Sequence, residues 1–275
     1  MFGRLGRNWK LSVGLGILAL ILLLAIFAPL VAGHDPVAMG YEAPFQPPLT
    51  GSNLLGTDNF GRDVFARVIF GFRVSLTVSV LSVFLASLVG VPMGLMAGYF
   101  GGWIDQVVMR PLDIVMAFPA IFLAIALIAV FGVGVSVAIL AIALIYVPVI
   151  ARTVRGSALA VRSEQFVEGA WARGASHLRI MFRHILPNCV GPLLIQISIL
   201  MGIAVLMEAG LSFLGLGTQP PTPALGLMLS EGRDFMEESY WVVTFPGLGV
   251  FLLVLGCNLV ADGLRQQLDV QGRRG

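Results

Sequence analysis

Residues 114–151 read IVMAFPAIFLAIALIAVFGVGVSVAILAIALIYVPVIA and contain no charged side chain over 38 positions. About 20 consecutive apolar residues cross the hydrocarbon core of a bilayer. A run of this length is too long for one membrane helix and predicts two, joined near Phe131–Gly134. Pro119 and Pro148 fall within the run, and membrane helices tolerate proline where neighbouring groups satisfy the freed backbone.

The rest of the chain is similarly apolar. Of its 275 residues, 57% are hydrophobic and 12% are charged, and the mean hydropathy is +0.93. Soluble domains are about 45–50% apolar and about 25% charged, so the composition disfavours a soluble enzyme, a disordered protein and a fibrous protein. We predict an all-α, polytopic membrane protein with six transmembrane helices. The other four spans are Leu11–Ala32, Val74 to about Tyr99, Ile185–Met207 and Ser239–Ala261.

Basic residues predict the orientation of these spans, because cytoplasmic loops carry an excess of lysine and arginine. With the N-terminus inside, the cytoplasmic segments hold 13 basic residues and the outer segments hold four. We therefore expect both termini in the cytoplasm and the first span to remain uncleaved, although a signal peptide is the alternative. The cytoplasmic segments are 1–10, 100–113, 152–184 and 262–275, and the outer segments are 33–73 and 212–238.

Several kinds of chemistry lack the residues that they require. The single lysine, Lys10, precedes Leu11, so the chain has no Gly-Lys-Ser/Thr step for a nucleotide-binding P-loop. Cys189 and Cys257 form no C-x-x-C pair. His177 and His184 have no further ligand at metal-site spacing. We expect no bound cofactor, no metal site and no nucleic-acid partner.

One polar loop interrupts the apolar pattern. Residues 151–187 read ARTVRGSALAVRSEQFVEGAWARGASHLRIMFRHILP. Ser163 is a candidate N-cap for a short helix through Trp171, Gly174 can end that helix with a positive φ, and Ser176 can cap a second helix. The short helix has an apolar face that needs a cover. Either the membrane surface or a groove on a cytoplasmic protein would supply it.

The spacing in this loop resembles the EAA loop of ATP-binding-cassette (ABC) importer permeases. That pattern is E-A-A, three residues, Gly, nine residues and I-x-L-P. The matching residues are Glu168, Ala170, Gly174, Leu186 and Pro187, while Gly169 replaces an alanine and His184 replaces an isoleucine. Further segments resemble the dipeptide/oligopeptide/nickel permeases of this family. They are 54–76, 207–223 and 258–269, with departures at Leu225 and Val270.

The resemblance implies an inner-membrane permease subunit that forms half of a solute pathway and is driven by separate ATPase subunits. It implies two ATPase subunits that bind ATP and Mg, a second permease, expected to be a different chain, and an extracytoplasmic solute-binding protein. We expect 1–73 to be an N-terminal span with an outer amphipathic segment, 74–269 the permease core, and 270–275 a short cytoplasmic tail. The residues implied in ATPase coupling are Glu168, Gly169, Ala170, Trp171, Arg173, Gly174, Leu186 and Pro187.

Three further features have two interpretations each. Gly90, Gly94 and Gly98 form a small-residue stripe for a helix contact, either within this chain or with the partner permease. Glu208, near the end of a span, either has a structural or gating role or contacts a solute amine on the translocation path. Residues 57–73 predict an interfacial helix with an Asp63–Arg67 pair, either as a rim for the binding protein or as a plain connector.

The main alternative function is a self-contained secondary transporter or channel. Such proteins often have internal repeats and intramembrane charges, and neither is visible here apart from Glu208. The sequence lacks the motifs that are usual for a membrane enzyme. A membrane anchor for a cytoplasmic partner, in contrast, is compatible with the polar loop. Within the permease family, a dipeptide, a longer peptide, a peptide-like compound and nickel all remain open as the solute.

Overall fold

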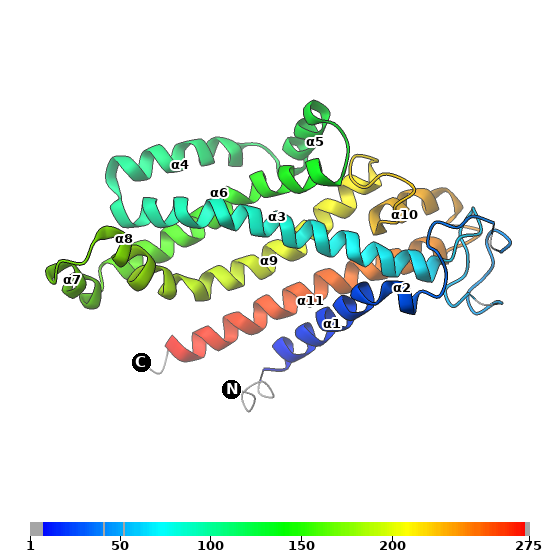
Figure 1. Cartoon of the computed structure of the whole chain (residues 1–275), viewed down its shortest axis with the longest axis horizontal. Helices are drawn as coiled ribbons and strands as arrows, with labels where there is room; N and C mark the ends of the chain where they lie inside the picture. The colour runs from blue at the N-terminus through cyan, green and yellow to red at the C-terminus, as the bar shows by residue number, and fades with distance from the viewer. Residues whose placement is uncertain (1–7, 41, 52, 273–275) are drawn as a thin grey trace.

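The computed structural model describes residues 8–40, 42–51 and 53–272, and most of this part is helical. Within it, five helices are long and apolar enough to cross a membrane, and a bent pair of helices makes a sixth candidate span. The all-α membrane fold is confirmed. The long helices run roughly along one axis, with α7 (Gln165–Ala172) at one end and α10 (Leu225–Gly232) toward the other (Figure 1). We call these the α7 end and the α10 end.

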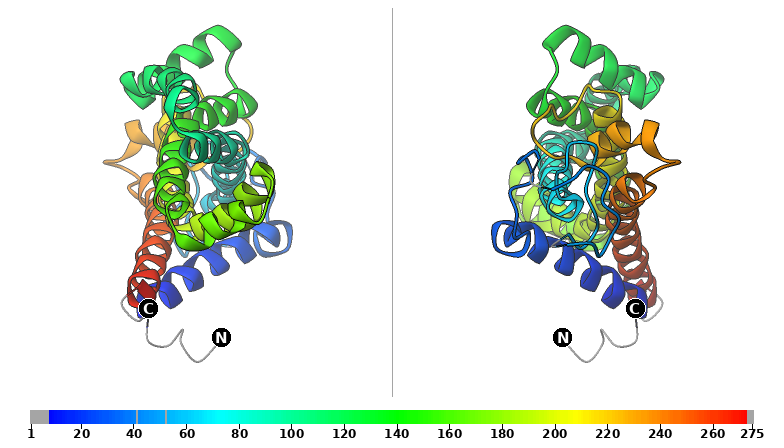
Figure 2. Two further views of the ribbon diagram at one scale, coloured as in Figure 1. Left: turned by 90° about the vertical axis from the view of Figure 1, so that its left-hand side faces the viewer. Right: turned by 90° about the vertical axis from the view of Figure 1, so that its right-hand side faces the viewer.

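The first and last spans lie side by side along one edge of the molecule (Figure 2), and the start of the first span and the end of the last lie toward the α7 end (Figure 1). These spans are α1 (Trp9–Ile26), which the short α2 (Ala28–Val31) follows, and α11 (Trp241–Gly272). The Asn8 side chain donates a hydrogen bond of 2.6 Å to the Gly263 carbonyl, and Lys10 pairs with Asp262 at 2.9 Å. These contacts fix the start of α1 against α11.

The central contact of the fold joins α3 (Val64–Phe100) to α6 (Val135–Arg162). All three glycines of the small-residue stripe lie against α6 of the same chain. A Cβ at Gly90 would lie 2.8 Å from the Val147 carbonyl oxygen, and one at Gly98 would lie 2.7 Å from the Arg155 carbonyl oxygen. The stripe therefore allows a close backbone approach inside the chain.

The segment 57–73 differs from its prediction. Residues 64–73 are the first turns of α3, which is 37 residues long and runs without interruption through the boundary that we expect between 73 and 74. A separate interfacial helix there is wrong. The reason is local: Asp63 adopts an extended conformation and its side chain accepts the Phe65 amide, so the helix begins at Val64 and reaches Gly101 without a second break.

The predicted joint between the third and fourth spans is confirmed, since α5 (Ala120–Phe131) ends at Phe131 and α6 begins at Val135. However, the third span is not one straight helix. The candidate for it is a bent pair, α4 (Gly102–Ala117) and α5, whose axes meet at 91°, and α4 covers most of the segment 100–113 that we expect to be a loop. The bend lies at Phe118–Pro119, where Phe118 is extended because the proline ring disfavours the helical conformation of the residue before it. Figure 2 shows this pair at the edge opposite α1 and α11.

After α7, the chain forms α8 (His177–Arg179), a π-helical segment η2 (Ile180–Ile185) and α9 (Leu186–Phe213) without a break. The predicted start of a span at Ile185 is therefore a change of helix type within one continuous helix, and Pro187 lies in the first turn of α9. After α9 come α10, the 3-10 turn η3 (Arg233–Phe235) and α11.

Candidate coupling and gating sites

The polar loop forms the predicted helical hairpin, with α7 as its projecting helix. Gly174 ends the hairpin's first arm with φ 78°, a value that glycine adopts without strain. Ser176 caps α8 by accepting the Arg179 amide at 3.4 Å. The predicted cap at Ser163 is wrong: α6 continues to Arg162, the Ser163 hydroxyl donates to the Ala160 carbonyl, and Glu164 is the residue that precedes α7.

The apolar residues of α7 divide between two faces. Val167 and Ala170 are buried against the body of the protein. Phe166 and Trp171 point outward, and Trp171 is 66% exposed. The side chains of Glu168 and Arg173 are exposed on the same helical turns and make no ion pair with any residue that the structure describes. An exposed aromatic ring beside unpaired charges is an arrangement that suits a protein partner.

The remaining predicted coupling residues surround this helix. Gly169 lies inside α7 in a position where an added Cβ would meet nothing within 4 Å. Leu186 and Pro187 are at the start of α9, with Leu186 half-buried and Pro187 exposed. Thus the hairpin presents Glu168, Trp171 and Arg173 outward, while Leu186 and Pro187 connect it to the next span.

Two ion pairs that sequence reasoning missed join α4 to α6 near the α7 end. Arg155 donates two hydrogen bonds of 2.5 Å to the carboxylate of Asp105, and Arg152 pairs with Asp113 at 2.6 Å. The residues of each pair are 50 and 39 positions apart, so no local spacing reveals them. They hold α4 against the part of α6 that leads into the hairpin.

Glu208 is buried at the contact between α9 and α3, with 1% of its surface exposed. The hydroxyl of Ser75 donates to one carboxylate oxygen at 2.7 Å, and that of Ser212 donates to the other at 2.8 Å. Ser212 in turn accepts the Thr218 amide. Both oxygens thus have a partner within the chain, which fits the structural or gating interpretation better than solute contact.

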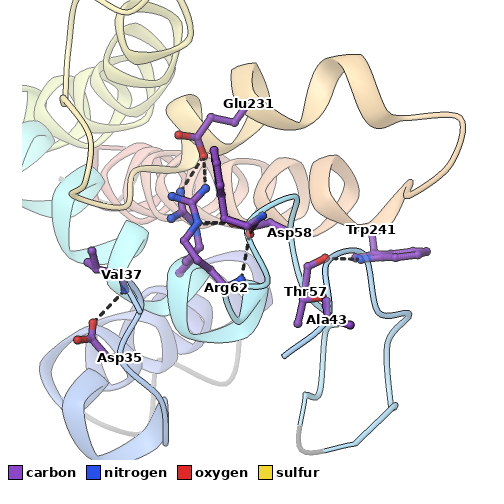
Figure 3. A network of polar contacts seen from close by, with 10 residues as sticks. Asp35, Val37, Ala43, Thr57, Asp58, Arg62, Glu231 and Trp241 are labelled. Carbon is purple, nitrogen blue, oxygen red and sulfur yellow. Dashed lines mark hydrogen bonds and ion pairs between the residues drawn. The ribbon is translucent and has the colours of Figure 1, made fainter. Parts of the chain in front are cut away.

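A buried ionic network lies at the α10 end. Arg62 pairs with Asp58 at 2.6 Å and with Glu231 of α10 at 2.9 Å (Figure 3). Arg67 of α3 also contacts Glu231, at 2.9 Å. Both arginine side chains are at most 3% exposed. The predicted Asp63–Arg67 pair is wrong. One carboxylate oxygen of Asp63 instead caps α3, and the other lies 3.1 Å from Nδ1 of His34.

A surface cavity of about 530 Å³ is formed by residues other than those of this network. It lies between the 33–37 segment and the proline-rich segment 221–223, with Phe70 of α3 in its wall. Its lining is largely proline and other apolar side chains, with His34 and Asp35 as the ionisable residues.

These features agree with comparisons to known proteins. Residues 90–271 match the family model described as "Binding-protein-dependent transport system inner membrane component". The chain belongs to this family. Residues 1–48 match a second model, the N-terminal TM domain of oligopeptide transport permease C. Both matches extend the resemblance that the loop suggested.

Several curated relatives are similar to this permease over nearly its full length. The dipeptide transport system permease protein DppC of Alkalihalophilus pseudofirmus is 43% identical over 98% of this chain and 88% of its own. The DppC protein of Haemophilus influenzae is 40% identical over 96% and 91%. The glutathione transport system permease protein GsiD of Pectobacterium atrosepticum is 44% identical over 78% and 71%.

The fold of this permease is also similar to that of solved transporters. A chain of the MetNI methionine ABC transporter, in an inward-facing conformation, has a TM-score of 0.60 at 21% identity and covers 73% of this chain and 95% of its own. At that identity the likeness concerns the fold alone. The family match and the relatives show that the chain is a transmembrane permease subunit of an ABC importer. It is an integral inner-membrane protein and a transporter component rather than an enzyme.

Proposed function

We propose that this permease imports di- or oligopeptides. The observation that carries the proposal is its similarity, over 98% of its length, to a relative named as a dipeptide permease. In this proposal the chain forms half of the pathway, a second and different permease chain forms the other half, and an extracytoplasmic binding protein delivers the solute.

Two ATPase subunits would bind ATP and Mg and drive the cycle. The absence of a Gly-Lys-Ser/Thr step from this chain supports that division of labour. The excess of arginine and lysine supports a cytoplasmic α7 end with both termini inside. The three sequence parts that we expect, 1–73, 74–269 and 270–275, are retained as a working division, with α3 bridging the first two.

The α7 helix is proposed to dock in a groove on one ATPase. Its exposed Trp171 would fill an apolar pocket, and Glu168 would form a charge-assisted contact with a basic ATPase residue. The full set of proposed coupling residues is Glu168, Gly169, Ala170, Trp171, Arg173, Gly174, Leu186 and Pro187.

Closure of the ATPase pair would shift the hairpin as one body, because Val167 and Ala170 hold α7 against the rest of the chain. The span α6 leads into the hairpin, and α8 leads out of it into the span α9. Both spans would therefore rock with the hairpin and exchange inward and outward access. Each ligand acts by binding one of these conformations better than the other.

At the opposite end, Glu208 is proposed as part of the outer gate through its bonds to α3 and to Ser212. The cavity beside the 221–223 segment is the proposed docking area for the binding protein. Its rigid proline-rich wall supports that assignment, since a stiff surface loses little conformational entropy on binding.

The test is reconstitution of the complex in proteoliposomes with its ATPases, second permease and binding protein. We expect uptake of a labelled dipeptide only when ATP is supplied on the side of the membrane that the ATPases face. Competition by unlabelled dipeptide, glutathione and Ni²⁺ then ranks the solute classes. Uptake by this chain without ATPases would show a secondary transporter and overturn the proposal.

A further inference from the structure

Tyr99, one residue before the end of α3, contacts the first residue of α8. Its Oη lies 2.7 Å from Nδ1 of His177, and the two rings are 5.6 Å apart with their planes at 63°. The ring of Phe100 lies at the same distance from His177. Tyr99 is 8% exposed and His177 is exposed, so the contact is partly buried, with the tyrosine on its protected side. It joins a span to the hairpin across 78 positions of sequence.

The residue that precedes the hairpin also contacts the end of α3. Arg162, the last residue of α6, donates to the Phe100 carbonyl at 3.5 Å. The hairpin residues 163–176 are therefore flanked on both sides by residues that contact the end of α3. A displacement of α7 would act on α3 as well as on the two spans that are covalently attached to the hairpin.

The far part of α3 contacts the groups at the α10 end. Ser75 is bonded to Glu208, and Arg67 is paired with Glu231 of α10. At 1.5 Å per residue, a 37-residue α-helix is about 55 Å long. One helix thus contacts the hairpin at one end and the proposed outer gate at the other.

We propose that the Tyr99–His177 hydrogen bond is a positioning contact that transmits the movement of the coupling hairpin to α3 and so to the α10 end. Neither residue is among the proposed coupling residues: Tyr99 lies outside the loop, and His177 falls between Gly174 and Leu186, at a position that the EAA pattern leaves open. The inference rests on the proposed function, since it requires an ATPase that moves the hairpin. It adds a third connection to those through α6 and α8.

The experiment uses the reconstituted complex and measures peptide transported per ATP hydrolysed. Tyr99→Phe removes the hydroxyl alone, and His177→Ala removes its partner. Each is expected to lower the ratio about three- to tenfold, the range for loss of one hydrogen bond. Because both changes break the same contact, the double variant is expected to be no worse than either single one. His177→Gln, which restores a hydrogen-bonding side chain, is expected to recover part of the ratio.

Tyr146→Phe is the matched control. Tyr146 is 4% exposed, and its Oη makes no hydrogen bond within the described residues, so its removal is expected to leave the ratio unchanged. A wild-type ratio in Tyr99→Phe, or losses that add in the double variant, would overturn the inference alone. If the wild-type complex took up peptide without ATP hydrolysis, the proposed function would fail first, and this inference with it.

Discussion

Arg67 of α3 and Glu231 of α10 form an ion pair with 2.9 Å between Nη2 and Oε2, although 164 positions separate them in sequence. The same carboxylate oxygen also accepts from Arg62. Asp58 also contacts both arginines, at 2.6 Å from Arg62 and 3.5 Å from Arg67, so two acids compensate two buried cations. The contact connects the start of a long span to the short helix that precedes the last span.

Glu231→Gln is expected to destabilise the permease by about 3 kcal/mol, because it leaves the two buried guanidinium groups to share the single charge of Asp58. Thermal unfolding in detergent measures the loss. Asp234→Asn is the matched control, since Asp234 pairs with Arg233 on the exposed surface and such pairs contribute little. Equal stability of the two variants would contradict a structural role for the network.

Gly94→Ala is expected to destabilise the contact between α3 and α6 by about 1–3 kcal/mol through overpacking. A Cβ at this position would overlap the Ala151 carbonyl oxygen and lie 3.0 Å from the Ala151 Cα. Gly16→Ala on α1, where nothing lies within 4 Å, is expected to be neutral or to stabilise slightly. Unfolding temperatures of the two alanine variants, measured side by side, decide the matter.

Glu208→Gln is expected to reduce peptide uptake about tenfold while the complex still assembles, because a neutral amide cannot accept from both Ser75 and Ser212 with the same strength. Uptake in proteoliposomes measures the effect. Glu237→Gln, at an exposed position near the same end, serves as the control. Unchanged uptake in Glu208→Gln would dispose of a charge-based role in the gate or the pathway.

Gly174→Val is expected to leave membrane insertion intact and to abolish solute-stimulated ATP hydrolysis. Valine at φ 78° is strained by about 1–3 kcal/mol, so the hairpin would refold locally and displace α7. Gly156→Ala on α6, outside the proposed coupling residues, adds a methyl group where nothing lies within 4 Å and should preserve the stimulation. Normal stimulation in the valine variant would remove Gly174 from the coupling mechanism.

The sequence patterns that predicted correctly are local ones. The joint after Phe131 depends on Gly132 and Gly134, both with positive φ, and the end of α7 depends on Gly174. These glycines act within one turn, so their effect is visible without the fold. The same holds for Ser176, whose hydroxyl caps α8.

The errors arise where a nearby group competes or where the partner is distant. Asp63 had two local uses, and capping the Phe65 amide prevailed over pairing with Arg67. Arg67 found its acid on α10, which no spacing rule indicates. The bend at Phe118–Pro119 did have a signal, since proline restricts the residue before it. That signal was outweighed by the length of the apolar run.

The π-helical segment η2 separates His177 from α9 by a turn wider than that of an α-helix. If the same residues wound as an ordinary α-helix, the wide turn would no longer absorb its extra residue, and everything upstream would rotate by about 100° about the helix axis. Tyr99 would then face a side chain other than His177, and α7 would point in another direction. The winding of this short segment thus sets the angular phase between the hairpin and the span that follows it, a constraint that acts on the number of residues in the turn rather than on their identity.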